Sequence, residues 1–170
     1  LPIHCYHRRS GNPERSAMEQ PTAITVRVPA TSANLGAGFD CLGLALDLFA
    51  SITVTFTGAE QPPTEDVGEK MVLTAIRQAY QRMGKQPPAG IRALHNVAIP
   101  LGRGLGASAV ARVAGIVAAN EYERHPLSEA AVLDLASELE GHGDNACPAL
   151  FGGMQVCVQS SSANFVHVPC

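Results

Sequence analysis

The sequence predicts a single domain that mixes strands and helices, an α+β fold, and three observations support this prediction. Four segments place apolar residues at alternate positions or in short apolar runs, as strands do. Three longer segments place them at helical spacing or on all faces. The chain has 170 residues, 46% of them hydrophobic, which is enough for one sizeable core.

The expected strands lie before and after the helices. Residues 23–28 alternate apolar and polar side chains until Pro29 ends the strand, and residues 44–56 place Ile52, Val54 and Phe56 on one face opposite threonines. Residues 91–99 form a third strand and residues 154–158 a closing one. A half-buried sheet is therefore expected.

The three expected helices differ in character. Residues 65–83 are amphipathic, with acidic residues first and Gly84 just beyond the end. Residues 109–119 are rich in Ala, Val and Ile with Arg112 as their only charge, which predicts a buried core helix. Residues 129–140 follow Ser128, a good N-cap, and Glu129 favours the helix dipole.

Composition narrows the functional classes. The net charge is −3 and no basic stripe appears, so nucleic acid is not an expected partner, and no apolar run is long enough for a membrane span. Five cysteines lack zinc-ligand spacing, which indicates reduced thiols in a cytoplasmic protein. We expect Cys41 and Cys147 to be core residues rather than nucleophiles.

The ends of the chain are expected to lie outside the domain. Residues 1–21 have no apolar period and no signal-peptide core, so we expect a disordered leader, with Met18 as a natural start. Residues 22–158 would form the domain. Residues 159–170, which include three consecutive serines, are expected to be a polar, frayed tail.

The segment most informative about function runs from Pro100 to Ser108, between an expected strand and the buried helix. Three glycines at alternate positions can turn backbone N–H groups inward, and a helix N-terminus adds its own unpaired N–H groups. A phosphate site is the functional interpretation, and a plain turn into a buried helix is the alternative. Other nucleotide loops fit poorly, because no Lys follows and Ala107 stands where a dinucleotide loop needs Gly.

Two further segments concentrate polar groups. The loop after Pro29 offers Asn34 and Asp40, which can bind a hydroxyl or an ammonium group, although a simple strand, turn and strand would explain the same residues. The end of the third helix gathers carboxylates, an imidazole and an amide; a solvated helix end is the alternative there. The polar residues of this helix end are Glu138, Glu140, His142, Asp144 and Asn145.

The glycine segment resembles the phosphate loop of the GHMP small-molecule kinases, Pro-x-x-x-Gly-Leu-Gly-Ser-Ser-Ala, with Ala107 in place of the first Ser. Residues 28–45 are similar to the first motif of the homoserine kinases within that family, Val-Pro-Ala-Thr-Ser-Ala-Asn-Leu-Gly-Pro-Gly-Phe-Asp, with Ala37 in place of Pro. Residues 140–153 resemble their Glu-Gly-His-Pro-Asp-Asn segment, with Gly143 in place of Pro.

The resemblance implies a GHMP kinase N-terminal domain, related to the second domain of ribosomal protein S5, without the C-terminal ferredoxin-like half. It implies ATP-dependent phosphorylation of L-homoserine to O-phospho-L-homoserine in threonine biosynthesis, with Mg²⁺, and a homodimer is a candidate assembly. Another GHMP kinase, or an inactive nucleotide-binding remnant, are the alternatives. If the chain belonged to another GHMP kinase, substrate screening would show a different acceptor.

The resemblance also implies roles for individual residues. Ser108 and Glu140 would hold Mg²⁺, with Glu138 as the alternative ligand. Catalysis would rest on Asp144 together with Ser108 and Glu140, and Asp144 would either orient the attacking hydroxyl or also take its proton. The substrate would contact Asn34, Asp40, His142, Asp144 and Asn145. The ATP phosphates would contact Pro100, Leu101, Gly102, Arg103, Gly104, Leu105, Gly106, Ala107 and Ser108.

Overall fold

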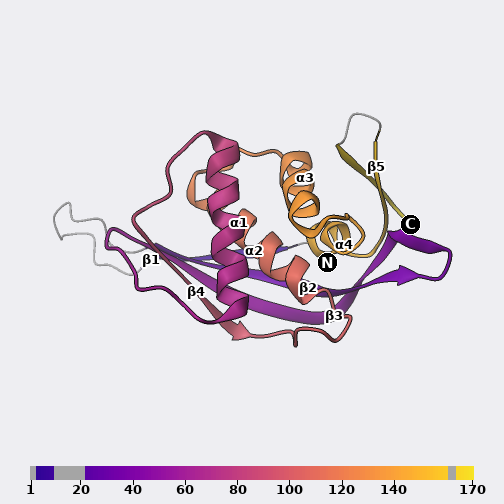
Figure 1. The fold of residues 1–170 in the computed structure, drawn as a ribbon, viewed down its shortest axis with the longest axis horizontal. Helices are drawn as coiled ribbons and strands as arrows, with labels where there is room; N and C mark the ends of the chain where they lie inside the picture. The colour runs from indigo at the N-terminus through magenta and orange to yellow at the C-terminus, as the bar shows by residue number, and fades with distance from the viewer. Residues whose placement is uncertain (1–2, 10–21, 161–163) are drawn as a thin grey trace.

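A computed structural model describes residues 3–9, 22–160 and 164–170 of the protein. Within these residues six strands form one antiparallel sheet, and four helices lie together on one face of it (Figure 1). The helices are α1 (Val67–Met83), α2 (Ala107–Tyr122), α3 (Glu129–Glu140) and α4 (Ala146–Phe151). The expected α+β fold is thereby confirmed.

The sheet is organised around β3 (Gly38–Thr57), which is long enough to serve two neighbours on the same edge. β2 (Thr22–Leu35) pairs with β3 along most of its length. On the other edge of β3, residues 51–57 pair with β4 (Gly90–Val97) and residues 42–44 pair with β5 (Met154–Gln159). β1 (His4–Arg9) and β6 (Phe165–Pro169) lie at the two ends of this order.

The core fills the space between the sheet and the helices. Side chains from the helix-facing side of β2 and β3 meet α1 and α2, and α2 is buried on nearly every face. Helix α1 begins at the cap Asp66, whose side chain accepts from Glu69 N at 2.6 Å, and it ends at Gly84 in the left-handed conformation. The expected burial of the helix that follows the glycine loop is confirmed.

The pairing between β2 and β3 is irregular close to the functional residues. Pro29 pairs with Phe49 and Thr31 pairs with Ala45, so β2 advances by two residues where β3 advances by four. The four consecutive residues 28–31 of β2 are all buried. The Thr31 side chain lies toward the helices, because its hydroxyl donates to Asn145 Oδ1 at the start of α4.

Two expectations about the chain ends are wrong. Within the expected disordered leader, residues 4–9 form β1, because the outer edge of β2 offers unpaired backbone groups and Cys5 packs against the core. Burial, and secondarily Glu121, raises the pKa of Cys5 to about 11. Residues 1–2 and 10–21 of that leader, including Met18, lie outside the described residues.

Within the expected polar tail, residues 165–169 form β6, which pairs with β5. The backbone N–H of Phe165 also donates to Asp134 Oδ1 of α3 at 2.6 Å, so the segment is fixed to a helix as well as to the sheet. Residues 161–163 are outside the described part. The domain therefore extends beyond the predicted limit of residue 158.

The structure also bears on membrane-spanning helices and on the cysteines. None of the described helices is long and apolar enough to cross a membrane. All five cysteines are free thiols, and Cys147 is fully buried, as expected for a core residue, while Cys41 is half-buried. A hydrogen bond with Cys157, together with burial, raises the pKa of the Cys147 thiol.

Candidate active site

The glycine loop connects β4 to α2 and has the backbone conformation that its sequence predicts. Gly102, Gly104 and Gly106 all have positive φ, at 70°, 68° and 62°, in the left-handed region that favours glycine. Gly106 is the N-cap of α2, and Ser108 lies in the first turn of that helix. The first backbone N–H groups of α2, which have no partner within the helix, therefore follow directly on the loop.

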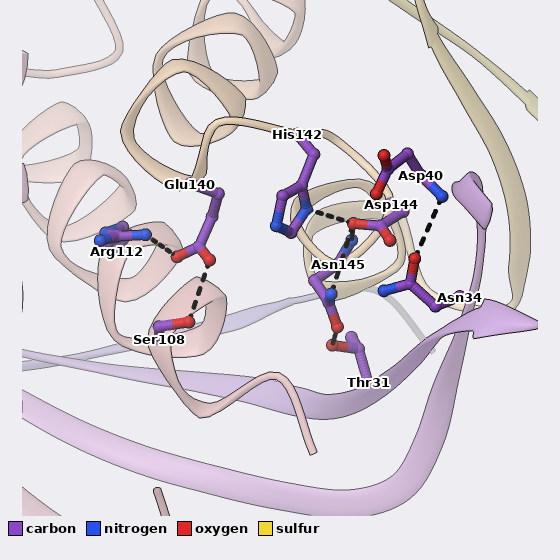
Figure 2. Close-up of polar contacts among 9 residues, drawn as sticks. All are labelled: Thr31, Asn34, Asp40, Ser108, Arg112, Glu140, His142, Asp144 and Asn145. Carbon is purple, nitrogen blue, oxygen red and sulfur yellow. Dashed lines mark hydrogen bonds and ion pairs between the residues drawn. The ribbon is translucent and has the colours of Figure 1, made fainter. Parts of the chain in front are cut away.

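A cavity of about 420 Å³ lies against this loop. It brings together residues from the three segments that the sequence marked as functional, which are the glycine loop, the loop after Pro29 and the end of α3. Its wall combines the loop and the start of α2 with Asn34 at the end of β2 and with residues around the end of α3 (Figure 2). The lining residues are Ala33, Asn34, Leu101, Gly102, Gly104, Leu105, Gly106, Ala107, Ser108, Glu140, His142 and Asn145.

Glu140 is held between two residues of α2 (Figure 2). The hydroxyl of Ser108 donates to Glu140 Oε2 at 2.9 Å, and the guanidinium of Arg112 pairs with Glu140 Oε1. The Glu140 side chain is only 6% exposed, whereas that of Glu138 is 51% exposed and pairs with Arg82. Of the two candidate carboxylates, only Glu140 borders the cavity.

Asp144 lies behind the cavity wall and not in it. It is fully buried, and its Oδ1 is hydrogen-bonded to His142 Nδ1 and accepts from the backbone N–H of Asn145 at 2.8 Å. Its Oδ2 is buried and has no hydrogen-bond partner among the described residues. A buried carboxylate oxygen without a donor is costly. His142 lines the cavity, and Asp144 fixes the imidazole from behind.

The turn between β2 and β3 carries the other predicted substrate residues. Asn34 and Asp40 have φ values of 59° and 57°, which are uncommon for residues other than glycine. Asn34 Oδ1 accepts from the backbone N–H of Asp40 at 3.1 Å. Asn34 lines the cavity, while Asp40 is exposed and lies outside the lining. Such backbone strain is found more often at functional sites.

Two residues that take part in this network were not among the predicted site residues. The Thr31 hydroxyl donates to Asn145 Oδ1 at 2.7 Å, and the Thr31 backbone N–H donates to Leu105 O at 3.1 Å. No sequence signal marks the register shift between β2 and β3 at Thr31. Arg112 did have a signal, because the only charge in a buried helix needs a partner of opposite sign.

A second cavity, of about 520 Å³, adjoins the first and shares Leu101 and Ala107 with it. It lies between β4, the start of α1 and the start of α2. Most of its wall is apolar. Polar groups are contributed by Asp66, Glu69, Arg92 and His95. The glycine loop therefore stands between two cavities, and we call the first one the polar cavity because Asn34, Ser108, Glu140, His142 and Asn145 lie on its wall.

Comparison with known proteins identifies the class to which this fold and loop belong. The family model described as "GHMP kinases N terminal domain" matches residues 70–153, which include most of α1, the loop, α2, α3 and α4. The chain therefore belongs to the GHMP kinases and forms their N-terminal domain. Mevalonate kinase of Methanococcus jannaschii, at 16% identity and a TM-score of 0.65, shows the same fold.

Within that class, several homoserine kinases are similar to this chain in sequence. The homoserine kinase of Nostoc punctiforme is 41% identical over 158 residues, and that of Gloeobacter violaceus is 45% identical over 149 residues. These alignments cover 86% and 79% of this chain but only 51% and 49% of the relatives. The chain thus spans about half the length of the curated relatives it matches.

A solved structure of a homoserine kinase also matches this chain over about half of its own length. The crystal structure of the enzyme from Cytophaga hutchinsonii matches with a TM-score of 0.72 at 28% identity, and the match covers 93% of this chain and 54% of that one. The described domain therefore corresponds to about half of a homoserine kinase in both sequence and structure.

Proposed function

We propose that this domain is the ATP-binding part of a homoserine kinase, which transfers the terminal phosphoryl group of ATP to the hydroxyl of L-homoserine. The observation that carries the proposal is the polar cavity, in which the glycine loop and the Asn34, Glu140, His142 and Asn145 side chains meet. The similarity to homoserine kinases over most of this chain supports it. Cytoplasmic location and dimerisation remain predictions.

The ATP phosphates would bind at the loop. Backbone N–H groups of residues 101–108 and the N-terminal end of α2 supply donors and a partial positive charge, both of which favour an anion. The adjoining cavity, reached past Leu101, is large enough and apolar enough for the nucleoside. This arrangement would place the terminal phosphate in the polar cavity.

The residues present fit Mg²⁺ bound together with ATP. Mg²⁺ commonly binds through one or two carboxylates plus substrate phosphates, and Glu140 and Ser108 supply a carboxylate and a hydroxyl on the cavity wall. The described residues contain no cluster of three or more metal-ligating side chains. A site in which ATP phosphates supply some of the ligands would not need such a cluster. When bound, Mg²⁺ would neutralise phosphate charge.

The acceptor would bind on the wall opposite the loop. Asn34 and His142 face the cavity there, and Asp144 holds the imidazole, so the pair would orient the attacking hydroxyl. The unpartnered Asp144 Oδ2 is a further acceptor for that hydroxyl if the wall opens on binding. Asp40, exposed beside Asn34, would be the carboxylate available to an ammonium group.

Phosphoryl transfer to a panel of alcohols tests the proposal. ADP release is measured with L-homoserine, L-serine, mevalonate and galactose, using this chain alone and together with the second half of a similar homoserine kinase. L-Homoserine should be the preferred acceptor in the combined sample. Preference for another alcohol would point to a different GHMP kinase, and ATP binding without any turnover would point to a nucleotide-binding domain.

A further inference from the structure

Thr31 links three segments that border the proposed site, which are β2, the glycine loop and the start of α4. It lies at the register shift between β2 and β3, its backbone N–H donates to Leu105 O of the glycine loop, and its hydroxyl donates to Asn145 Oδ1 at the start of α4. The Thr31 side chain is completely buried. Neither bond contributes to the β2 ladder, and the bond to Asn145 lies among the polar contacts of the site (Figure 2).

The loop backbone packs directly on this pair. A Cβ atom added to Gly106 would overlap Thr31 Oγ1 and would lie 2.9 Å from Asn145 Oδ1. The Asn145 amide is therefore next to the last glycine of the phosphate loop, and it also lines the polar cavity. It stands where a phosphate on the loop and a hydroxyl on the opposite wall would meet.

The Thr31 hydroxyl and the Asp144 carboxylate together determine which way this amide faces. The oxygen and nitrogen of an Asn side chain can exchange places, and their hydrogen-bond partners determine the orientation. Because Oδ1 accepts from Thr31 at 2.7 Å, the amino group is placed on the other side. One of its hydrogens points to Asp144 Oδ1 at 3.3 Å, which leaves the other for a ligand oxygen.

We infer that Thr31 is a positioning residue that presents the Asn145 amino group, as a hydrogen-bond donor, to the terminal phosphate of ATP. The inference rests on the proposed function, because it assumes that ATP phosphates occupy the loop. It adds a residue outside the predicted site and a specific contact with the phosphoryl group that is transferred. ADP, which lacks that group, does not form the contact.

The test compares ATP and ADP affinities in this chain by calorimetry. Thr31→Val keeps the shape and the backbone bond to Leu105 but removes the hydroxyl, while Thr31→Ser keeps the hydroxyl. Thr25→Val is the matched control, because Thr25 and Thr53 form a similar hydroxyl pair at 2.7 Å elsewhere in the same strand. Thr31→Val should weaken ATP binding about tenfold and leave ADP binding unchanged. Thr31→Ser and Thr25→Val should retain the parent ratio.

A structural role alone would give a different pattern, since a distorted loop would weaken ATP and ADP binding equally. Equal losses, or an unchanged ATP to ADP ratio in Thr31→Val, would overturn the inference. If the parent chain bound neither nucleotide, the proposed function would fail first and the inference with it. The side-chain amide signal of Asn145 in a ¹⁵N correlation spectrum provides a second readout, which should move in Thr31→Val and stay in Thr31→Ser.

Discussion

Ser108 and Glu140 are 32 positions apart in the sequence, yet the Ser108 hydroxyl donates to Glu140 Oε2 at 2.9 Å on the wall of the polar cavity. This bond joins the first turn of α2 to the last residue of α3. Arg112 holds the other carboxylate oxygen from the next turn of α2, so the carboxylate is fixed before any ligand arrives. Such preorganisation would suit the role proposed for Glu140, in which its carboxylate meets Mg²⁺ and ATP together.

Replacing Glu140 by Gln should reduce the dependence of ATP binding on Mg²⁺. The amide keeps the size of the side chain but loses the negative charge that would attract the cation. We expect the enhancement of ATP affinity by Mg²⁺, measured by calorimetry with and without the metal, to fall at least about tenfold. Glu138→Gln is the control, because Glu138 is exposed and pairs with Arg82. Equal Mg²⁺ dependence in parent and Glu140→Gln would exclude Glu140 as a ligand.

Gly106→Ala should abolish nucleotide binding, whereas Gly84→Ala should not. Both glycines have positive φ, at 62° and 67°, so the backbone conformation alone costs each variant about 1 kcal/mol or slightly more of folding free energy. Only at Gly106 would the added methyl group also overlap Thr31, while at Gly84 nothing lies within 4 Å. Calorimetry with ATP and urea unfolding separate the two effects. Equal ATP affinities in the two variants would contradict the account of the loop.

Tyr80 and Glu123 should make stability depend on pH. The Tyr80 hydroxyl donates to Glu123 Oε1 at 2.9 Å. Burial alone would raise the pKa of Glu123, but hydrogen bonds from Lys85 and Tyr80 outweigh it and lower the pKa below 4.5. Because the pKa is depressed in the folded state, the stabilisation is present above about pH 4.5 and is lost as the pH falls further.

Tyr80→Phe tests this dependence through urea unfolding at pH 7 and pH 3. The variant should be less stable than the parent by about 1–2 kcal/mol at pH 7, where a charged carboxylate accepts the bond. The difference should shrink at pH 3, as the acceptor becomes neutral. A difference that stays constant or grows toward acid would show that the hydroxyl does not interact with the carboxylate charge.

The hairpin of β5 and β6 should cause the isolated chain to associate. Val158, Val166 and Val168 are all exposed there, and Val158 and Val166 are directly opposite in register. Contiguous apolar surface of this kind promotes association, and β6 is also a sheet edge. Light scattering should show a mass that rises with concentration. The V166T/V168T variant should lower it, while V67T, at an exposed valine of α1, should leave it unchanged.

The sequence predicted best the elements whose signals are local. Helix α3 begins and ends at the predicted residues, because Ser128 caps its start and Gly141 takes the left-handed conformation at its end. The glycine loop was predicted because positive φ values are typical of glycine, which is visible in the sequence. β1 and β6 were missed since these short segments become strands only by pairing with an available edge.

Only part of the site was predicted, because its local motifs are visible in the sequence and its long-range contacts are not. Asn34, Glu140, His142 and Asn145 do gather at one cavity with the loop, whereas Asp40 and Asp144 lie outside its lining. The role of Thr31 depends on a register shift between two strands, which no residue pattern records. The short helix α4, which places Asn145 at its N-terminus, was also not expected from the sequence.

The measurement that tests the central claim most directly is a titration of the ¹⁵N-labelled chain with Mg²⁺ and ATP, followed by backbone amide shifts. The account predicts saturable binding, with the largest shifts at the amides of residues 102–108 and at Asn145. Binding that shifts other amides, for example those of α3 far from Glu140, while leaving the loop unchanged would contradict the claim that this loop holds the phosphates. Absence of binding would contradict it equally.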